Sequence, residues 1–131
     1  MAKTALVTGA SSGIGREIAR DLSARGFRVI LSARREERLR ELAEELGDNT
    51  RVIVCDVSDR EECLRLYEET KSEKISVLVN CAGFGAVGSF DKLPLDTELK
   101  MIDTNITAVH MLTKLFLKDF VAADRGYIMT V

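Results

Sequence analysis

The segment Thr8-Gly-Ala-Ser-Ser-Gly-Ile-Gly15 joins an apolar strand to the start of a helix, and so it indicates how the chain folds. The strand pattern is Thr4-Ala-Leu-Val7, and the helical pattern continues through Ile18 and Leu22. Glycine at 9, 13 and 15 allows a tight turn, a close approach of the backbone to a ligand, and close packing of the helix on the sheet. The free N–H groups at the start of such a helix attract anions. The turn therefore predicts a dinucleotide pyrophosphate as ligand, although a glycine run by itself is also found in ordinary connections.

The remaining strands show the same kind of apolar run. Each run is nearly continuous rather than alternating, which indicates a strand that is buried on both faces. Helical patterns lie between the runs, so the connections should be right-handed crossovers within a parallel sheet. The sequence predicts a single α/β domain over 1–131, a Rossmann-like doubly wound parallel sheet that stops in its fifth strand. The runs are Ala5–Val7, Val29–Leu31, Val52–Val54, Val77–Val79 and Tyr127–Met129.

Helix ends can also be predicted from the sequence. Gly47 ends the helix that contains Leu39 to Leu46, and Ser58-Asp-Arg-Glu61 has the form of a capping box for the next helix. The last helix should be the longest, with Asp96 or Thr97 as its cap. It should present one apolar side, formed by Leu99, Ile102, Ile106, Val109, Phe116 and Phe120.

Composition argues against several classes of partner. The chain has 19 Lys and Arg against 21 Asp and Glu, a net charge of −2, so it has no basic field for nucleic acid. No stretch approaches the ~20 apolar residues of a membrane span, and the first apolar run is too short for a signal sequence. We therefore expect a cytoplasmic protein without a nucleic-acid or membrane partner. Cys55, Cys63 and Cys81 lack metal-binding spacing, so we expect free thiols and no metal site.

The end of the second strand indicates which dinucleotide is bound. NAD-binding proteins place an acidic residue there for the ribose 2′-hydroxyl, whereas Ser32-Ala-Arg-Arg35 supplies two guanidinium groups. A charge-assisted contact with a 2′-phosphate contributes about 1.5–3 kcal/mol, or roughly a ten- to hundredfold preference. We therefore expect NADP(H) to be preferred over NAD(H), through Arg34 first and Arg35 second. The alternative is that both arginines belong to a solvated helix face.

Four motifs in order make the chain resemble the short-chain dehydrogenase/reductase family over its whole length. The Thr-Gly-x-x-x-Gly-Ile-Gly pattern of 8–15 resembles the cofactor loop, and Asp56-Val57 resembles the pair that holds the adenine ring. Asn80-Cys-Ala-Gly83 is similar to the family's Asn-Asn-Ala-Gly, and Asn105 matches the asparagine of its long fourth helix. Together with Arg34 and Arg35, whose role was inferred above from their charge, the residues that the resemblance implies form the predicted cofactor-binding set: Thr8, Gly9, Ser11, Ser12, Gly13, Ile14, Gly15, Asp56, Val57, Asn80, Ala82 and Gly83.

Each of these residues also has a plainer interpretation. Asp56 can be a turn residue, the segment from Asn80 can simply end a strand, and Asn105 can be a polar residue on a helix flank. Asparagine is a poor residue for the middle of a helix, and such a conflict often marks function. The resemblance implies that Asn105, through its backbone and a bound water, supports a catalytic proton relay. His110 does not share the face of Asn105, and we interpret it as a surface residue.

The family's chemistry depends on a serine after the fifth strand and on a Tyr-x-x-x-Lys in the next helix. The chain stops before both, and Tyr67-Glu-Glu-Thr-Lys71 matches the second only by chance, since it precedes Asn80. The resemblance implies an NADP-dependent oxidoreductase of the carbonyl reductase or alcohol dehydrogenase type, acting on a small carbonyl or alcohol substrate. These 131 residues would be its cofactor-binding portion and inactive alone. The alternative is a stand-alone, non-catalytic nucleotide-binding or regulatory module. Members of the family commonly pair their fourth and fifth helices between subunits, so the resemblance also allows a homo-oligomer through the long fourth helix.

Overall fold

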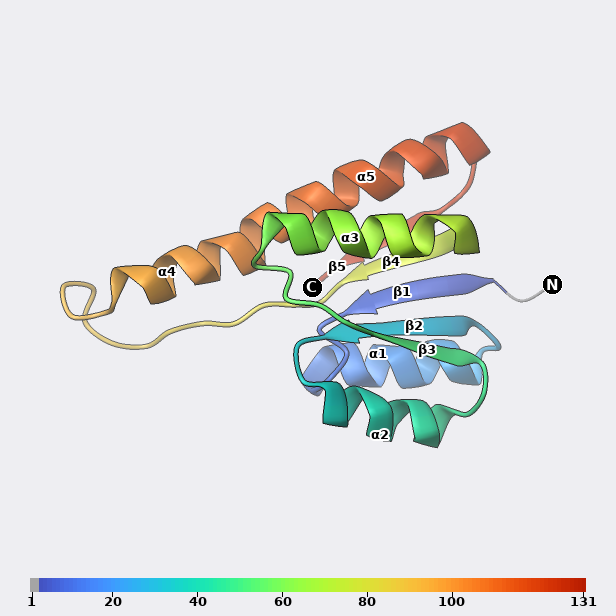
Figure 1. Ribbon diagram of the computed structural model, residues 1–131, viewed down its shortest axis with the longest axis horizontal. Helices are drawn as coiled ribbons and strands as arrows, with labels where there is room; N and C mark the ends of the chain where they lie inside the picture. The colour runs from blue at the N-terminus through green and yellow to red at the C-terminus, as the bar shows by residue number, and fades with distance from the viewer. Residues whose placement is uncertain (1–2) are drawn as a thin grey trace.

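Five parallel strands form one sheet in the order β3-β2-β1-β4-β5, in a computed structural model that describes residues 3–131 (Figure 1). The strands are β1 (Thr4–Thr8), β2 (Arg28–Ala33), β3 (Thr50–Val54), β4 (Ile75–Asn80) and β5 (Tyr127–Thr130). The helices are α1 (Gly13–Ala24), α2 (Glu36–Leu46), α3 (Arg60–Thr70), η1 (Lys71–Glu73), α4 (Leu95–Ile102), η2 (Asp103–Thr107) and α5 (Ala108–Ala123). All neighbouring strands run parallel, which confirms the predicted Rossmann-like α/β sheet.

Helices cover both faces of the sheet, with α1 and α2 on one face and α3 and α5 on the other (Figure 1). Successive residues of β1 pack against the helices on opposite faces of the sheet. Leu6 packs toward Phe116 of α5, and Val7 packs toward Leu39 of α2. Side chains of a strand alternate between faces, so a strand covered on both sides must be apolar at every position. This accounts for the continuous apolar runs of β1, β2 and β4.

The edge strand β5 departs from the prediction that every strand is buried on both faces. Only Ile128 of this strand packs into the core under α5, whereas Tyr127 is 71% exposed and Met129 is 50% exposed. The cause is its position, since β5 pairs only with β4 and has a helix over one face. The apolar run Tyr127–Met129 therefore correctly predicted the strand β5, but the prediction that this strand is buried on both faces is wrong.

Two of the predicted helix caps are wrong. The N-cap of α3 is Asp59, whose carboxylate accepts a hydrogen bond from the backbone N–H of Glu61. Ser58 instead donates from its hydroxyl to Asp56, and so it is not part of a capping box. Helix α4 follows Pro94, and neither Asp96 nor Thr97 caps it because both already lie inside the helix. The fixed backbone angle of proline suits the entry to a helix, so α4 begins at Pro94 without the predicted polar cap.

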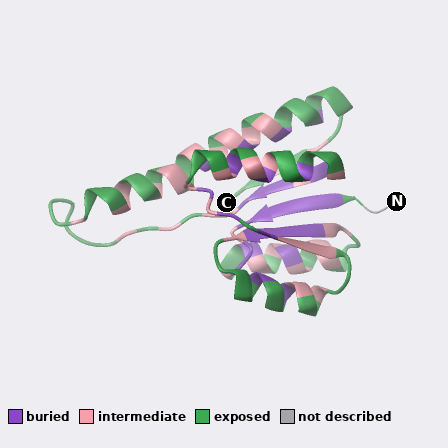
Figure 2. Cartoon of the chain, viewed as in Figure 1, coloured by how far each residue is buried: buried purple, intermediate pink, exposed green. Residues whose placement is uncertain are grey.

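The last helical segment is long, as predicted, but a π-helical turn, η2, divides it into α4 and α5. Helix α4 extends beyond the carboxyl ends of the strands (Figure 1), and none of its residues is buried (Figure 2). Phe116 and Phe120 are buried against the sheet, whereas Leu99, Ile102 and Ile106 are exposed. The predicted apolar side is therefore buried only along α5. A π turn inserts an extra residue into the helical repeat and rotates the helix face that follows it.

Candidate nucleotide-binding site

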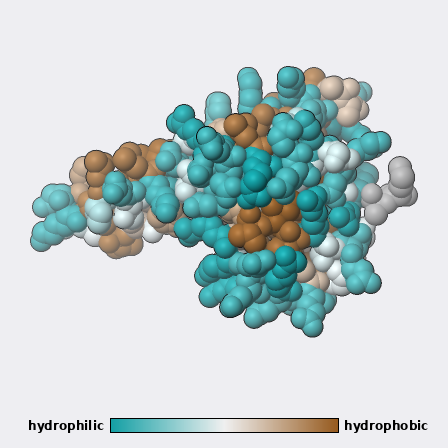
Figure 3. All heavy atoms as spheres, viewed as in Figure 1, coloured by the Kyte–Doolittle hydropathy of each residue, from teal (hydrophilic) through white to brown (hydrophobic). Residues whose placement is uncertain are grey.

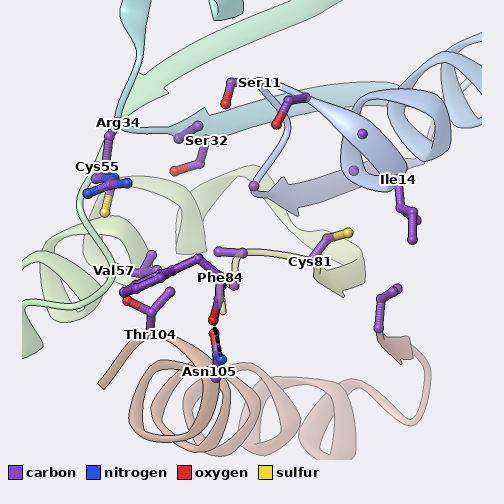
Figure 4. A pocket seen from close by; sticks show the side chains of 18 of the residues that line it. Ser11, Ile14, Ser32, Arg34, Cys55, Val57, Cys81, Phe84, Thr104 and Asn105 are labelled. Carbon is purple, nitrogen blue, oxygen red and sulfur yellow. Dashed lines mark hydrogen bonds between the residues drawn. The ribbon is translucent and has the colours of Figure 1, made fainter. Parts of the chain in front are cut away.

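A pocket of about 590 Å³ opens at the carboxyl ends of the strands (Figure 4). It lies over β1, where the chain changes direction, because β2 and β3 are on one side of β1 and β4 and β5 are on the other. Ligands of open α/β sheets bind at this kind of switch point. The glycine-rich turn, the ends of β2, β3 and β4, and the π turn all contribute to the lining.

The glycine-rich turn leaves a hollow that side chains would fill. Gly9 has a φ of +63°, and a Cβ atom there would lie 2.7 Å from the backbone of Ala82. A Cβ atom on Gly15 would collide with the carbonyl oxygen of Gly9. The N-cap residue of α1, Ser12, makes no side-chain capping bond, so the first N–H groups of this helix are left for another acceptor. The turn thus presents a helix N-terminus of the kind that accepts phosphate.

Thr8 and Asn80 lie behind the pocket wall and do not line it. The Thr8 hydroxyl donates to the carbonyl oxygen of Val79 at 3.3 Å and accepts from the N–H groups of Cys81 and Ala82. Asn80 is buried, and its amide donates to Thr113 at 3.1 Å. These contacts join β1 to the end of β4 and tie β4 to α5. The two residues predicted for cofactor contact therefore position the residues around them.

The two arginines after β2 both line the pocket, but they are held differently. Arg35 donates to the hydroxyl oxygens of Ser12 at 3.2 Å and Ser11 at 3.4 Å, which links the start of α2 to the glycine-rich turn. Arg34 makes no side-chain hydrogen bond or ion pair within the part of the chain that the structure describes. The guanidinium group of Arg35 is thus already hydrogen-bonded to the turn, whereas the guanidinium group of Arg34 has no partner among the described residues.

Asp56 and Val57 follow β3 at the same edge of the sheet and line the pocket. The Asp56 carboxylate accepts hydrogen bonds from the hydroxyl of Ser58 at 2.7 Å and from its N–H at 3.0 Å. Partial burial would raise the pKa of Asp56, but these hydrogen bonds, with Arg34 and Lys100 nearby, hold that pKa below its ordinary value. The pocket therefore contains an anionic hydrogen-bond acceptor as well as two arginines.

Asn105 lies in the π turn and holds the segment that leaves β4. Its side-chain oxygen accepts from the N–H of Phe84 at 3.0 Å, and its amide donates to the carbonyl oxygen of Phe84 at 2.8 Å (Figure 4). Gly83 leaves room for this contact, because a Cβ atom there would lie 2.9 Å from the Asn105 side-chain oxygen. Asparagine is unfavourable in a regular α-helix, but Asn105 lies in a π turn, where its side chain makes two hydrogen bonds to the backbone of Phe84.

Sequence reasoning brought together most of the pocket lining. Gly9, Ser11, Ser12, Gly13, Ile14, Gly15, Arg34, Arg35, Asp56, Val57, Ala82, Gly83 and Asn105 all line it. It missed several neighbours of these residues: Ser32, Ala33, Cys55, Cys81, Phe84, Thr104, Val109 and Val131. Their position in the sequence could have indicated five of them, since these five directly precede or follow a predicted residue. Thr104 in particular adjoins Asn105 in the π turn.

No cofactor contact is predicted for Tyr67, His110 or the three cysteines. The Tyr67 hydroxyl donates to the Asp119 carboxylate of α5 at 2.7 Å, away from the pocket, as its position before Asn80 indicated. His110 is exposed, and the three cysteines are free thiols. Within residues 3–131, no three His, Cys, Asp or Glu side chains gather as a metal site, and no helix there is long and apolar enough to span a membrane.

The family model described as short chain dehydrogenase matches residues 3–131. The chain belongs to the short-chain dehydrogenase family. A curated relative, the 3-oxoacyl-(acyl-carrier-protein) reductase FabG of Rickettsia prowazekii, is 36% identical over 129 residues, covering 98% of this chain and 53% of the relative. An uncharacterized oxidoreductase of Staphylococcus saprophyticus is 36% identical over 135 residues, covering 98% of this chain and 58% of the relative.

Solved members of the short-chain dehydrogenase family have the same arrangement of elements. The serine dehydrogenase from Escherichia coli superimposes with a TM-score of 0.87 at 35% identity, covering 97% of this chain and 60% of that structure. A metagenomic short-chain oxidoreductase in complex with NADP gives a TM-score of 0.92 at 34% identity, covering 98% and 61%. The chain thus spans little more than half the length of the relatives that it matches.

Proposed function

We propose that this chain is the cofactor-binding portion of an NADP-dependent oxidoreductase that interconverts a small carbonyl compound and an alcohol. Membership of the short-chain dehydrogenase family supports the oxidoreductase class, and the relatives named above are described as reductases, dehydrogenases or oxidoreductases. They give no support to the alternative of a stand-alone regulatory module. A nicotinamide dinucleotide supplies the hydride donor or acceptor of such a reaction.

The residues of the pocket fit this dinucleotide. The hollow above Gly9 and Gly15 has no Cβ atoms, and the uncapped start of α1 offers N–H groups to a pyrophosphate. Asp56 is an anionic acceptor for an exocyclic amine. Asn105 acts as a positioning residue here, because its clamp on Phe84 fixes the backbone next to Gly83.

The preference for NADP(H) is supported mainly by Arg34, whose guanidinium group makes no hydrogen bond or ion pair among the described residues. Arg35 already donates to Ser11 and Ser12, so a 2′-phosphate would recruit Arg34 without breaking an existing contact. The pocket lining offers no carboxylate at the end of β2 that would accept a hydrogen bond from a ribose 2′-hydroxyl. A phosphate bound between two guanidinium groups and the serine hydroxyls would be strongly charge-assisted.

The test is a comparison of NADPH and NADH affinity by the fluorescence of the bound nicotinamide. The unaltered chain should bind NADPH roughly ten- to hundredfold more tightly than NADH. Arg34→Ala should remove most of this ratio by weakening NADPH alone. Arg38→Ala, an exposed arginine of α2 outside the pocket, serves as the control. An unchanged ratio in Arg34→Ala would refute the assignment to Arg34, and equal affinities in the unaltered chain would refute the NADP preference.

A further inference from the structure

Phe84 is the one aromatic side chain among the described residues that line the nucleotide-binding pocket. It lies just beyond β4, directly after Gly83, and it is half-buried. The two hydrogen bonds with Asn105 use only the backbone of Phe84, so they leave its ring free for another contact. A flat aromatic ring at the wall of a ligand pocket offers a large contact area and a π face.

The backbone of Phe84 is fixed at both of its polar groups. The side-chain oxygen of Asn105 accepts from the N–H of Phe84 at 3.0 Å, and the Asn105 amide donates to the carbonyl oxygen of Phe84 at 2.8 Å. Both bonds come from the π turn η2, which continues into α5, and α5 packs on the sheet through Phe116. A ring on a backbone that is already fixed loses little conformational freedom when a ligand packs on it. The position of Phe84 is therefore suited to a binding contact.

The ring of Phe84 lies in the part of the pocket next to Asp56. Figure 4 shows the ring between Val57, which follows β3, and Thr104, which lies in the π turn. Asp56 directly precedes Val57 and is the carboxylate that accepts an exocyclic amine in the proposed function. Adenine carries such an amine as a hydrogen-bond donor. An adenine whose amine is bound by Asp56 therefore lies on the same side of the pocket as the ring.

The residues on either side of Phe84 are glycines, so they add no side chain beside the ring. A Cβ atom on Gly85 would meet no atom within 4 Å other than those of its two neighbours, and the space there is open. Nucleic-acid bases stack on aromatic side chains of this kind through their π faces, and the loss of one such contact weakens binding about tenfold.

We propose that the ring of Phe84 stacks on the adenine of the bound dinucleotide. The inference rests on the proposed function and adds a contact to the face of the base, whereas Asp56 binds its edge. Asn105 is then a positioning residue for the base as well, because it fixes the backbone that carries the ring. The stacking selects a ligand that carries a purine, independently of the selection for a 2′-phosphate by Arg34.

The chain has no tryptophan, so the fluorescence of a Phe84→Trp chain reports on this position alone. Adenosine 2′,5′-bisphosphate is the probe, because it carries the adenine and the 2′-phosphate but no nicotinamide. Stacking of adenine on the indole should quench the tryptophan fluorescence saturably. The matched control is Phe90→Trp, in the same segment between β4 and α4, where the side chain is 83% exposed and outside the pocket. This control should bind the probe, as measured by titration calorimetry, without quenching.

Affinities of variants without a tryptophan test the contact itself. Phe84→Ala should weaken the binding of adenosine 2′,5′-bisphosphate and of NADPH by the same factor, about tenfold, because the stacked base is common to both ligands. Phe84→Leu keeps an apolar side chain without a π face and should lose an intermediate amount. Phe90→Ala should leave both affinities unchanged. Circular dichroism verifies the fold of each variant, and the Phe84→Trp experiment does not depend on the stability of Phe84→Ala.

Three results would overturn this inference while the proposed function stands. The first is no quenching in Phe84→Trp at a probe concentration that saturates it by calorimetry, and the second is an equal loss of affinity in Phe84→Ala and Phe90→Ala. The third is a loss for NADPH but not for adenosine 2′,5′-bisphosphate, which would place the ring against the nicotinamide. If the unaltered chain binds neither ligand, the proposed function fails, and this inference fails with it.

Discussion

Two glycines of the turn after β1 have a positive φ in different surroundings. At Gly9, φ is +63° and an added Cβ atom would lie 2.7 Å from the backbone of Ala82, whereas at Gly13, φ is +56° and the added atom would meet open space. Gly13→Ala should therefore cost only the left-handed backbone, about 1–2 kcal/mol of unfolding free energy. Gly9→Ala adds a collision and should cost about 2–5 kcal/mol. Urea unfolding of both variants provides the measurement, and equal losses would contradict this account.

The ionisation of Tyr67 gives a prediction about pH. Its hydrogen bond to the Asp119 carboxylate raises the pKa of Tyr67 to about 12, because tyrosinate would lie against a negative charge. An unperturbed tyrosine has a pKa of about 10. Since the folded-state pKa is the higher one, the stability linked to this group is present below pH ~10 and is lost as the pH rises toward 12.

Absorbance of tyrosinate in a Tyr127→Phe chain follows Tyr67 alone. The midpoint should lie near 12, and Asp119→Asn should move it down toward the ordinary value. Asp91→Asn, in the exposed loop before α4, should leave the midpoint unchanged. A midpoint that ignores Asp119→Asn would show that the hydrogen bond does not control this ionisation.

At the scale of elements, the starts of α3 and α4 differ in how they are capped. Asp59 accepts from the N–H of Glu61, whereas Asp96 lies within the first turn of α4 and makes no capping bond. Asp59→Ala should destabilise the chain by about 1 kcal/mol, the usual value for a lost cap. Asp96→Ala should cost only a few tenths, through the helix dipole. Thermal unfolding followed by circular dichroism compares the two, and a larger loss at Asp96 would reverse the assignment.

The elements themselves could be predicted from the sequence where short-range patterns determine them. The apolar runs of β1, β2 and β4 and the stop at Gly47 correspond to strands and a helix end in the structure. Long-range geometry is what the sequence did not reveal. Asn105 in the π turn bonds to Phe84, 21 residues earlier in the chain, and Tyr127 is exposed on an edge strand, and no short-range pattern predicts either arrangement. The predicted motif residues line the pocket, except for Thr8 and Asn80, which are buried and make hydrogen bonds that hold β1, β4 and α5 together.

At the scale of the whole molecule, the arm formed by α4 presents an apolar surface (Figure 3). Leu95, Leu99, Ile102 and Ile106 are all at least 45% exposed, and none of the residues of α4 is buried. A continuous apolar stripe of this kind favours association. We therefore propose that the arm pairs two copies of the chain.

Sedimentation velocity over a range of concentrations tests the pairing. The unaltered chain should show a concentration-dependent larger species, and Leu99→Glu combined with Ile106→Glu should shift it to the monomer. Leu64→Glu, at an exposed leucine of α3, is the control for a new charge on an apolar surface residue. A monomer at all concentrations in the unaltered chain would exclude the pairing.

The position of β1 between β2 and β4 has a consequence for synthesis on the ribosome. Strand β1 pairs with β2 on one side and with β4 on the other, and Val79 of β4 follows Thr8 of β1 by 71 residues. At the usual rate of elongation, about 4 to 14 s separate the two strands. During this interval one side of β1 has no neighbour, while β2 has already been made. Strand β1 is therefore an interior strand of the folded sheet but an edge strand in the nascent chain before β4 is made, and this is when it is most open to a chaperone or to the wrong partner.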